Sequence, residues 1–377
     1  MALKSVGSVR LAQLLLLGVV SAVIPAEKAR SEEARSYVVS WFSLATNNTD
    51  GDCSKGVHPE IEKVWARYLD LLDLPAADRE KYKRQLAEGE VDGEVMEILS
   101  NRGRIDGKPV NPWRHPASVP DINLPGLDGK LAYGFNLSGK GESKPSSFQD
   151  PETGQRGVEN QLYRAMGCAR TMRGQNDNPP TYWKWLWGQL RDSIPAWIIT
   201  IKGQDLAKDG PVTVSFDRAL EHARANPDGS HRANMSYRLD PDPRSHNEFK
   251  GEIKKGVLTL VPAEKFRMLA DPLLMPEIVL SRFNARLHLK PDGRLDGFIG
   301  GFQSWHQIYG GLSGMAFGGE GQVVGDLTQY YYLMKKHADA DPDPVTGQNM
   351  SISATYYLEA VPAFASPVQH ASQVVGQ

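Results

Sequence analysis

The chain lacks the short motifs that most directly identify an enzyme. Its 377 residues contain no GxSxG, HExxH, P-loop or CxxCH sequence, and the glycines at 318–325 lack the strand-turn-helix context of a phosphate-binding loop. An excess of either charge is also absent, because 43 Lys and Arg residues stand against 45 Asp and Glu residues. A nearly neutral chain offers no basic field for DNA or RNA, so we expect no nucleic-acid partner.

The chain also lacks an apolar run long enough to cross a membrane. The run Leu11–Ile24 falls short of the roughly 20 residues that a spanning helix needs. Lys4 and Arg10 precede it and the small residue Ala26 follows, which is typical of a secretory signal peptide over residues 1–26. An uncleaved anchor helix is the alternative. We expect a mature protein without a membrane span, located in the periplasm or secreted.

Cysteine is scarce, with only Cys53 and Cys168 present. Export would place both residues in an oxidising compartment, where a pair is usually bonded, so a disulfide is predicted. Two separate buried thiols are the alternative, because a bridge requires the two Cα atoms to lie roughly 4.4–6.8 Å apart. Thiol redox catalysis is less favoured, since there is no CxxC motif.

The hydrophobic pattern changes along the chain and suggests two domains. Residues 27–178 are predicted to form a helical and loop-rich domain, with helices near 61–72, 77–87 and 94–101. Residues 179–377 show short alternating segments separated by turns, interrupted by one helix near 326–337. The predicted fold class is therefore mainly β with an α-helical N-terminal part and a C-terminal antiparallel β-sandwich or jelly roll.

The polar segment from Asp121 to Asn160 is rich in Asp, Asn, Glu and Gly and has no apolar run that would build a core. Oxygen donors on a Gly-rich loop suit calcium, which accepts irregular sets of carboxylate, amide and carbonyl ligands. The candidate ligands are Asn136, Asp150, Glu152, Glu159 and Asn160, with Asp121, Asn123 and Asp128 as additions. The alternative is that Asp150 and Asn160 cap local turns and that the other acids are solvated.

Two further patterns bear on function. His306, Glu320 and Asp326 lie near one another in a Gly-rich stretch and are weak candidates for the catalytic residues of a hydrolase. The aromatic segment TYWKWLWGQL at 181–190 has the residues of a carbohydrate-binding platform, but a packed helix is the simpler explanation.

Four segments carry a resemblance to a known group of proteins: GFNLSG at 134–139, FQDPETGQRGVENQ at 148–161, GC at 167–168 and SISATYYLEAVPAF at 351–364. On these segments the chain resembles a family of exported bacterial proteins for which no activity is known. Its relatives carry Asp where this chain has Ser138, which weakens any metal site using that position. We expect an exported, non-enzymatic binding or structural protein, stabilised by calcium, with an envelope or extracellular ligand; a secreted hydrolase and a carbohydrate-binding module are the alternatives.

Overall fold

The computed structural model describes residues 32–90, 93–111, 115–140, 144–173, 187, 191, 194–271, 275–315 and 321–368. Residues Glu32–Gln377 form one compact unit. The signal peptide predicted over 1–26 and the domain joint predicted at 174–180 both lie outside the described residues.

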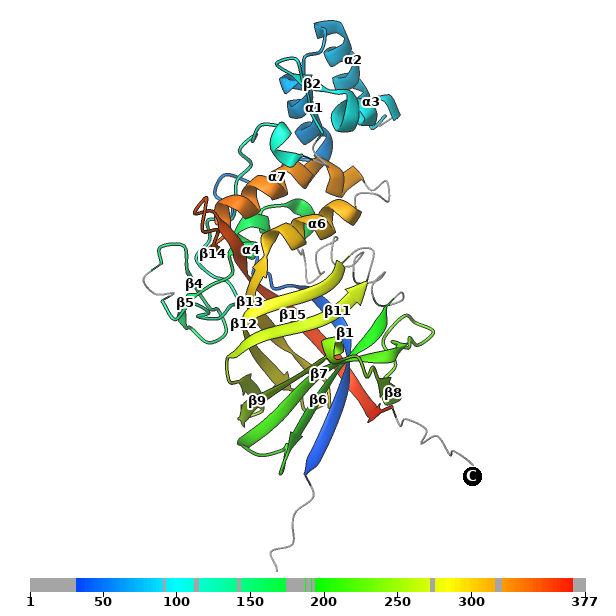
Figure 1. Cartoon of the computed structure of the whole chain (residues 1–377), viewed down its shortest axis with the longest axis vertical. Helices are drawn as coiled ribbons and strands as arrows, with labels where there is room; N and C mark the ends of the chain where they lie inside the picture. Colours follow the sequence, from blue (N-terminus) through cyan, green and yellow to red (C-terminus); the bar gives the residue numbers. More distant parts are fainter. Residues whose placement is uncertain are drawn as a thin grey trace, which may run out of the picture. The chain divides into compact units, whose positions relative to one another are not determined.

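Eight antiparallel strands form a closed barrel. Each strand pairs with the next around the ring, and the last strand pairs with the first. Figure 1 shows the barrel strands. In order around the ring they are β1 (Glu33–Leu44), β6 (Pro195–Gly203), β7 (Gly210–His222), β9 (His246–Lys254), β10 (Val257–Leu260), β12 (Met275–Leu289), β13 (Leu295–Ser304) and β15 (Asn349–Pro367).

The predicted β-sandwich or jelly roll is therefore wrong. Strand β7 pairs with β9, and β1 pairs with both β6 and β15, so the sheet edges that a sandwich would leave open are joined. A barrel strand alternates inward and outward residues just as a sandwich strand does. The alternation of apolar and polar residues therefore predicts most of the strands. Whether those strands form a sandwich or a barrel depends on which distant strands pair, and alternation does not show that.

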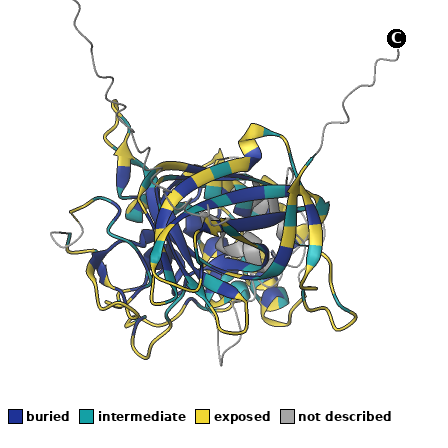
Figure 2. Cartoon of the chain, turned by 90° about the horizontal axis from the view of Figure 1, so that it is seen from below, coloured by how far each residue is buried: buried dark blue, intermediate teal, exposed yellow. Residues whose placement is uncertain are grey.

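Aromatic and aliphatic side chains fill the barrel. In β7 the residues Val212, Val214 and Phe216 are buried and alternate with less buried neighbours, as expected for a strand with one face on the core. The ring of Phe216 packs edge-on against those of Phe266 and Phe283. Figure 2 shows the molecule from below, with buried strand residues inside and exposed turns at the periphery. The barrel is thus a packed core.

Three further strands extend this sheet, and two small hairpins lie apart from it. Strand β11 (Ala263–Asp271) pairs with β12, β14 (Ala340–Pro342) pairs with β15, and β8 (Met235–Leu239) runs parallel to β15. The hairpins are β2 (Arg104–Ile105) with β3 (Lys108–Pro109), and β4 (Phe148–Gln149) with β5 (Arg156–Val158).

The described helices are few and mostly short. They are α1 (Ile61–Leu71), α2 (Ala76–Ala87), α3 (Gly93–Glu97), α4 (Gln161–Met166), α6 (Trp305–Met315) and α7 (Gly321–His337). Helix α7 contacts α1, α4 and α6, and both α4 and α6 contact the barrel strand β15. Helix α7 therefore connects the first helices to those that lie against the barrel. No helix in the described ranges combines the length and the apolar composition needed to cross a bilayer.

The predicted α-helical N-terminal part is also wrong. Residues 33–44 form β1, a full strand of the barrel, and only the short helices α1, α2 and α3 follow it. Strand β1 escaped prediction because Tyr37, Val38 and Val39 are all buried in succession. Val38 packs in one apolar cluster and Val39 in another, so both faces of the strand are covered and the alternation is lost.

Candidate functional site

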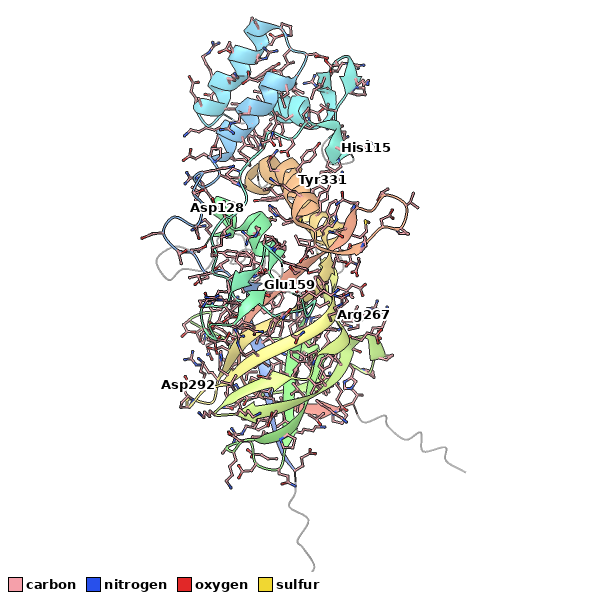
Figure 3. The ribbon with its side chains drawn as sticks, turned by 90° about the vertical axis from the view of Figure 1, so that its left-hand side faces the viewer. His115, Asp128, Glu159, Arg267, Asp292 and Tyr331 are labelled. Atoms are coloured by element: carbon pink, nitrogen blue, oxygen red, sulfur yellow. A yellow bond between two sulfur atoms is a disulfide. The ribbon has the colours of Figure 1, made fainter. Side chains whose placement is uncertain are left out.

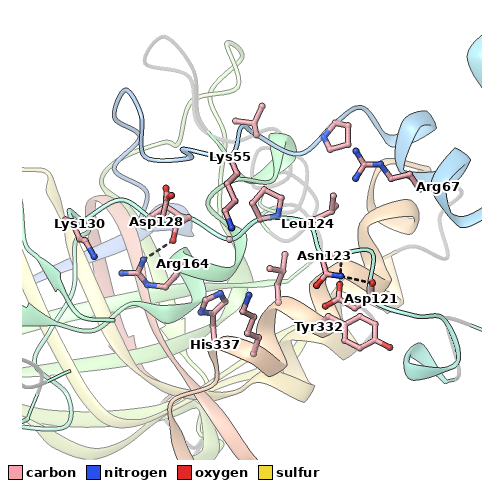
Figure 4. A pocket seen from close by; sticks show the side chains of 17 residues that line it. Lys55, Arg67, Asp121, Asn123, Leu124, Asp128, Lys130, Arg164, Tyr332 and His337 are labelled. Carbon is pink, nitrogen blue, oxygen red and sulfur yellow. Dashed lines mark hydrogen bonds between the residues drawn. The ribbon is translucent and has the colours of Figure 1, made fainter. Parts of the chain in front are cut away.

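A cavity of about 730 Å³ lies where five segments of the chain meet. Its walls come from the loop before α1, from α1 itself, from residues 121–130, from α4 and from the last turn of α7. In Figure 4 the side chain of Lys55 comes from one wall, and those of Arg164 and His337 from the wall opposite. The volume is in the range of small-molecule sites, roughly 300–1,000 Å³.

Local sequence shapes the wall formed by residues 121–130. Asp121 Oδ1 accepts a hydrogen bond from Asn123 N at 2.7 Å, which forms a tight turn with Asn123 at a φ of 57°. Gly126 then passes close to two other elements, because a Cβ atom there would lie 2.9 Å from both Arg164 O and His337 Nε2. Only glycine allows this segment to lie against α4 and α7 at that point.

Arg164 is the most unusual residue of the cavity wall. Its side chain is buried, with only 7% of the residue exposed, and its guanidinium donates to the carbonyl oxygens of Leu127 and Ser146 at 2.9 Å each. The guanidinium also lies 3.9 Å from the centre of the Phe148 ring. Among the described residues no carboxylate lies within 4.0 Å of it, and its Nε has no hydrogen-bond partner. Burial lowers the pKa of Arg164, although the group remains charged.

The rest of the cavity wall is also rich in cations. Lys55, Arg67, Lys130 and Lys336 line it and are exposed, and none forms an ion pair within the described part of the chain. With Arg164, five Lys and Arg residues stand against two acids, Asp121 and Asp128 (the latter labelled in Figure 3). Unpaired positive charges around a concave surface raise the local concentration of anions.

His337 adds a neutral polar group beside these cations. Burial, together with the nearby charges of Lys336 and Arg164, lowers the pKa of His337 to about 4. The imidazole is therefore uncharged at neutral pH and can both donate and accept a hydrogen bond.

The predicted disulfide is confirmed and lies beside the cavity. Cys53 and Cys168 are joined, with their Cα atoms 5.9 Å apart. The bridge attaches the loop that carries Lys55 to the end of α4. The same loop is held by Asp52 O, which accepts hydrogen bonds from Asp128 N and Gly129 N at 3.0 Å each. Two walls of the cavity are thus fixed to each other.

Two of the predicted calcium ligands, Asp150 and Glu152, bind an arginine side chain. Asp150 is fully buried, and its Oδ2 accepts a hydrogen bond from Arg286 at 2.9 Å, while Glu152 accepts from the same guanidinium at 3.1 Å. Glu152 also bonds His288 at 2.7 Å. Asp150 additionally accepts from the backbone N–H groups of Glu152 and Thr153, as the alternative interpretation of a capped turn required.

The other three predicted ligands lie closer to α4. Glu159, labelled in Figure 3, pairs with Lys144 and accepts from Ser138 N at 2.7 Å. Asn160 caps α4 by accepting from Tyr163 N, and Asn136 follows the bridge between Phe135 and Glu159. Within the described ranges no three Asp, Glu, His or Cys side chains are grouped as metal ligands. Calcium binding stays a prediction.

Of the three catalytic candidates, the structure describes the side chain of His306 alone. His306 is exposed at the start of α6, and its ring stacks on that of Trp305 with the centroids 3.6 Å apart. Glu320 lies outside the described residues, as does the side chain of Asp326 in α7. For the carbohydrate alternative, Trp187 is buried against Phe42, while the tryptophans at 183 and 185 lie outside the described residues.

Sequence reasoning missed the cationic cavity. Its cations come from segments far apart in the chain, and Arg164 in QLYRAM has the appearance of an ordinary helix cation. The one local signal is the segment at 120–130, whose acids Asp121 and Asp128 favour a bound cation, whereas the folded chain places it among Lys and Arg residues.

No family model matches the chain, and neither a curated protein nor a solved structure matches it.

Proposed function

We propose that this protein is an exported binding protein whose cavity holds a small organic anion. The observation that carries the proposal is Arg164, a buried cation on the cavity wall with no carboxylate partner among the described residues. Removing a charge from water is costly unless an opposite charge compensates it. A bound anion would supply that compensation from the cavity side.

The remaining features of the cavity favour an organic anion over a bare inorganic ion. Lys55, Arg67, Lys130 and Lys336 supply further positive charge at its exposed parts. Val57, Pro59 and Tyr332, which are not buried, add apolar surface to the lining, which suits the carbon body of a ligand. A ligand with one or two anionic groups and a small apolar body would match both kinds of surface.

The disulfide supports the exported location, since such bonds persist mainly in oxidising compartments. The run Leu11–Ile24 and the resemblance to exported bacterial proteins point the same way, toward the periplasm or the exterior of the cell. N-terminal sequencing of periplasmic material is expected to show a chain lacking its first 25 to 30 residues. Recovery of a Met1 start in the membrane fraction would contradict export with cleavage.

The binding proposal is tested by calorimetric titration at low salt with two probes, citrate and phenyl phosphate. We expect one-to-one binding of at least one probe, weakened by added salt because the exposed cations are screened. Lys130→Gln and Lys336→Gln are each expected to lower the affinity about two- to fivefold, the effect of an exposed charge. Arg164→Met is expected to abolish binding.

The matched control is Lys202→Gln, because Lys202 is an exposed lysine of β6 that does not line the cavity. Its affinity should equal that of the wild type. Failure of both probes to bind at millimolar concentration would overturn the proposal, as would equal losses in the Lys130 and Lys202 variants. Melting curves of each variant separate loss of binding from loss of folding.

A further inference from the structure

Asp128 brings a negative charge to the cationic cavity. Its carboxylate lines the cavity and acts electrostatically on the buried guanidinium of Arg164. Its Oδ1 accepts a hydrogen bond from Ser54 N at 3.0 Å, and its Oδ2 accepts from Ser54 Oγ. The hydrogen bonds from the hydroxyl and the backbone of Ser54 hold the pKa of Asp128 below its usual value, so the group is an ionised acceptor.

The position of this carboxylate is fixed by its backbone as well as by its side chain. Asp128 N and Gly129 N both donate to Asp52 O, and the neighbouring Cys53 is bonded to Cys168. The carboxylate therefore has little freedom to turn away from an anion that enters the cavity. An anion in the cavity therefore lies near the cations and also near one negatively charged hydrogen-bond acceptor, the fixed carboxylate of Asp128.

An ionised carboxylate can only accept hydrogen bonds, so it distinguishes anions by whether they carry a proton. A phosphate monoester with its second pKa near 6 carries an acidic hydroxyl below that pH and can donate it to the carboxylate. A sulfate monoester has the same shape and no such proton, and its oxygen atoms would face the carboxylate and be repelled. A repulsive contact of this kind is an effective source of specificity.

Resting on the proposed anion-binding function, we propose that the cavity takes phosphate monoesters in their protonated, singly charged form, and that Asp128 selects them against sulfate monoesters. Asp121, the other acid of the cavity wall, has a different setting. It accepts a hydrogen bond from Asn123 N at 2.7 Å, and in Figure 4 it lies beside Tyr332, away from Arg164. Selection is therefore assigned to Asp128 alone.

The test is a titration of phenyl phosphate and phenyl sulfate at pH 5.5, where much of the phosphate ester is singly charged. The wild type is expected to bind the phosphate at least tenfold more tightly than the sulfate. Asp128→Asn, whose amide can donate to a sulfate oxygen, is expected to reduce that ratio to about threefold or less. Asp121→Asn keeps the Asp128 carboxylate and is expected to preserve the ratio.

The outcomes separate this inference from the function on which it rests. If neither citrate nor either ester binds, the anion-binding proposal itself fails. If citrate binds and neither ester does, anion binding stands and the inference of a phosphate monoester is refuted. If both esters bind the wild type equally, or if Asp128→Asn leaves the ratio unchanged, anion binding stands and selection by Asp128 is refuted. Melting curves check that each variant folds, and Asp128→Ser replaces Asp128→Asn if the amide variant does not.

Discussion

Replacing Arg286 by Met should destabilise the protein strongly. Arg286 in β12 is 8% exposed and lies 2.9 Å from Asp150, which is fully buried. The Met side chain keeps much of the apolar packing against Phe298 but removes the charge. Losing one partner of a buried pair typically costs about 3–5 kcal/mol, because the other charge stays desolvated. We expect the lower end, about 3 kcal/mol, since backbone N–H groups of Gly134, Glu152 and Thr153 still bond Asp150.

The pH dependence of the loss gives a sharper test. Burial alone would raise the pKa of Asp150, but the hydrogen bonds from Thr153 N and Arg286 outweigh it and hold the pKa below the usual value. A lowered carboxyl pKa contributes stability that is present above the unfolded pKa of about 4 and is lost below it. The deficit of Arg286→Met should therefore be largest at pH 7 and shrink toward pH 4, where Asp150 becomes protonated in the variant.

Urea unfolding at pH 7 and pH 4.5 measures both quantities. Arg35→Met is the matched control, because Arg35 and its partner Glu33 are 42% and 37% exposed and such pairs contribute at most about 1 kcal/mol. Adding Asp150→Asn to Arg286→Met should recover part of the loss by removing the unpaired charge. A loss below about 1 kcal/mol at pH 7, or one that does not change with pH, would refute the reasoning.

Three further predictions concern stability. Reduction of the disulfide, which spans 115 residues, should lower the free energy of unfolding by roughly 4–5 kcal/mol, and the reductant should have no effect on the double variant Cys53→Ala, Cys168→Ala in the same urea titration. Burial, opposed by the hydrogen bond from Ser353 N, raises the pKa of Asp339 to about 6. The stability should therefore fall by about 2 kcal/mol as the pH rises from 4 to 7, and Asp339→Asn should abolish the fall. If the segment 121–160 binds calcium, a hundredfold excess over Kd should stabilise the fold by about 2.7 kcal/mol relative to excess chelator; an unchanged melting temperature in the wild type and in Asp150→Ala would exclude it.

Local features of this fold were predictable where one physical rule decided them. Helix α7 follows the apolar spacing of Leu327, Tyr330, Tyr331 and Met334. The pairing of Cys53 with Cys168 was predicted from the expectation of export and from the presence of two cysteines. Strands such as β7 and β9 were predictable for the same reason, because each has one covered and one less covered face.

Nonlocal features were not predictable, and the reasons differ. Strand β1 shows no alternation because a register shift between Val39 and Trp41 and the covered outer face hide it. The contact of Asp150 and Glu152 with Arg286 was not predictable, because nothing near them in the sequence indicates this arginine of β12. The cationic cavity depends on five segments that only the folded chain assembles.

The closure of the barrel by β1 and β15 sets a constraint on how the chain folds. Ser36 pairs with Ala363 and Leu44 with Tyr356, so nearly the whole described chain must be in place before the ring can close. Contacts of such long range carry a large loop-closure entropy and are expected to form late and slowly. Until then β1 and β15 each present an open edge that other chains can join, so the interval before closure is when this protein is most exposed to aggregation. A chain that stays open until its last strand is delivered is also one that can be threaded through an export channel before it folds.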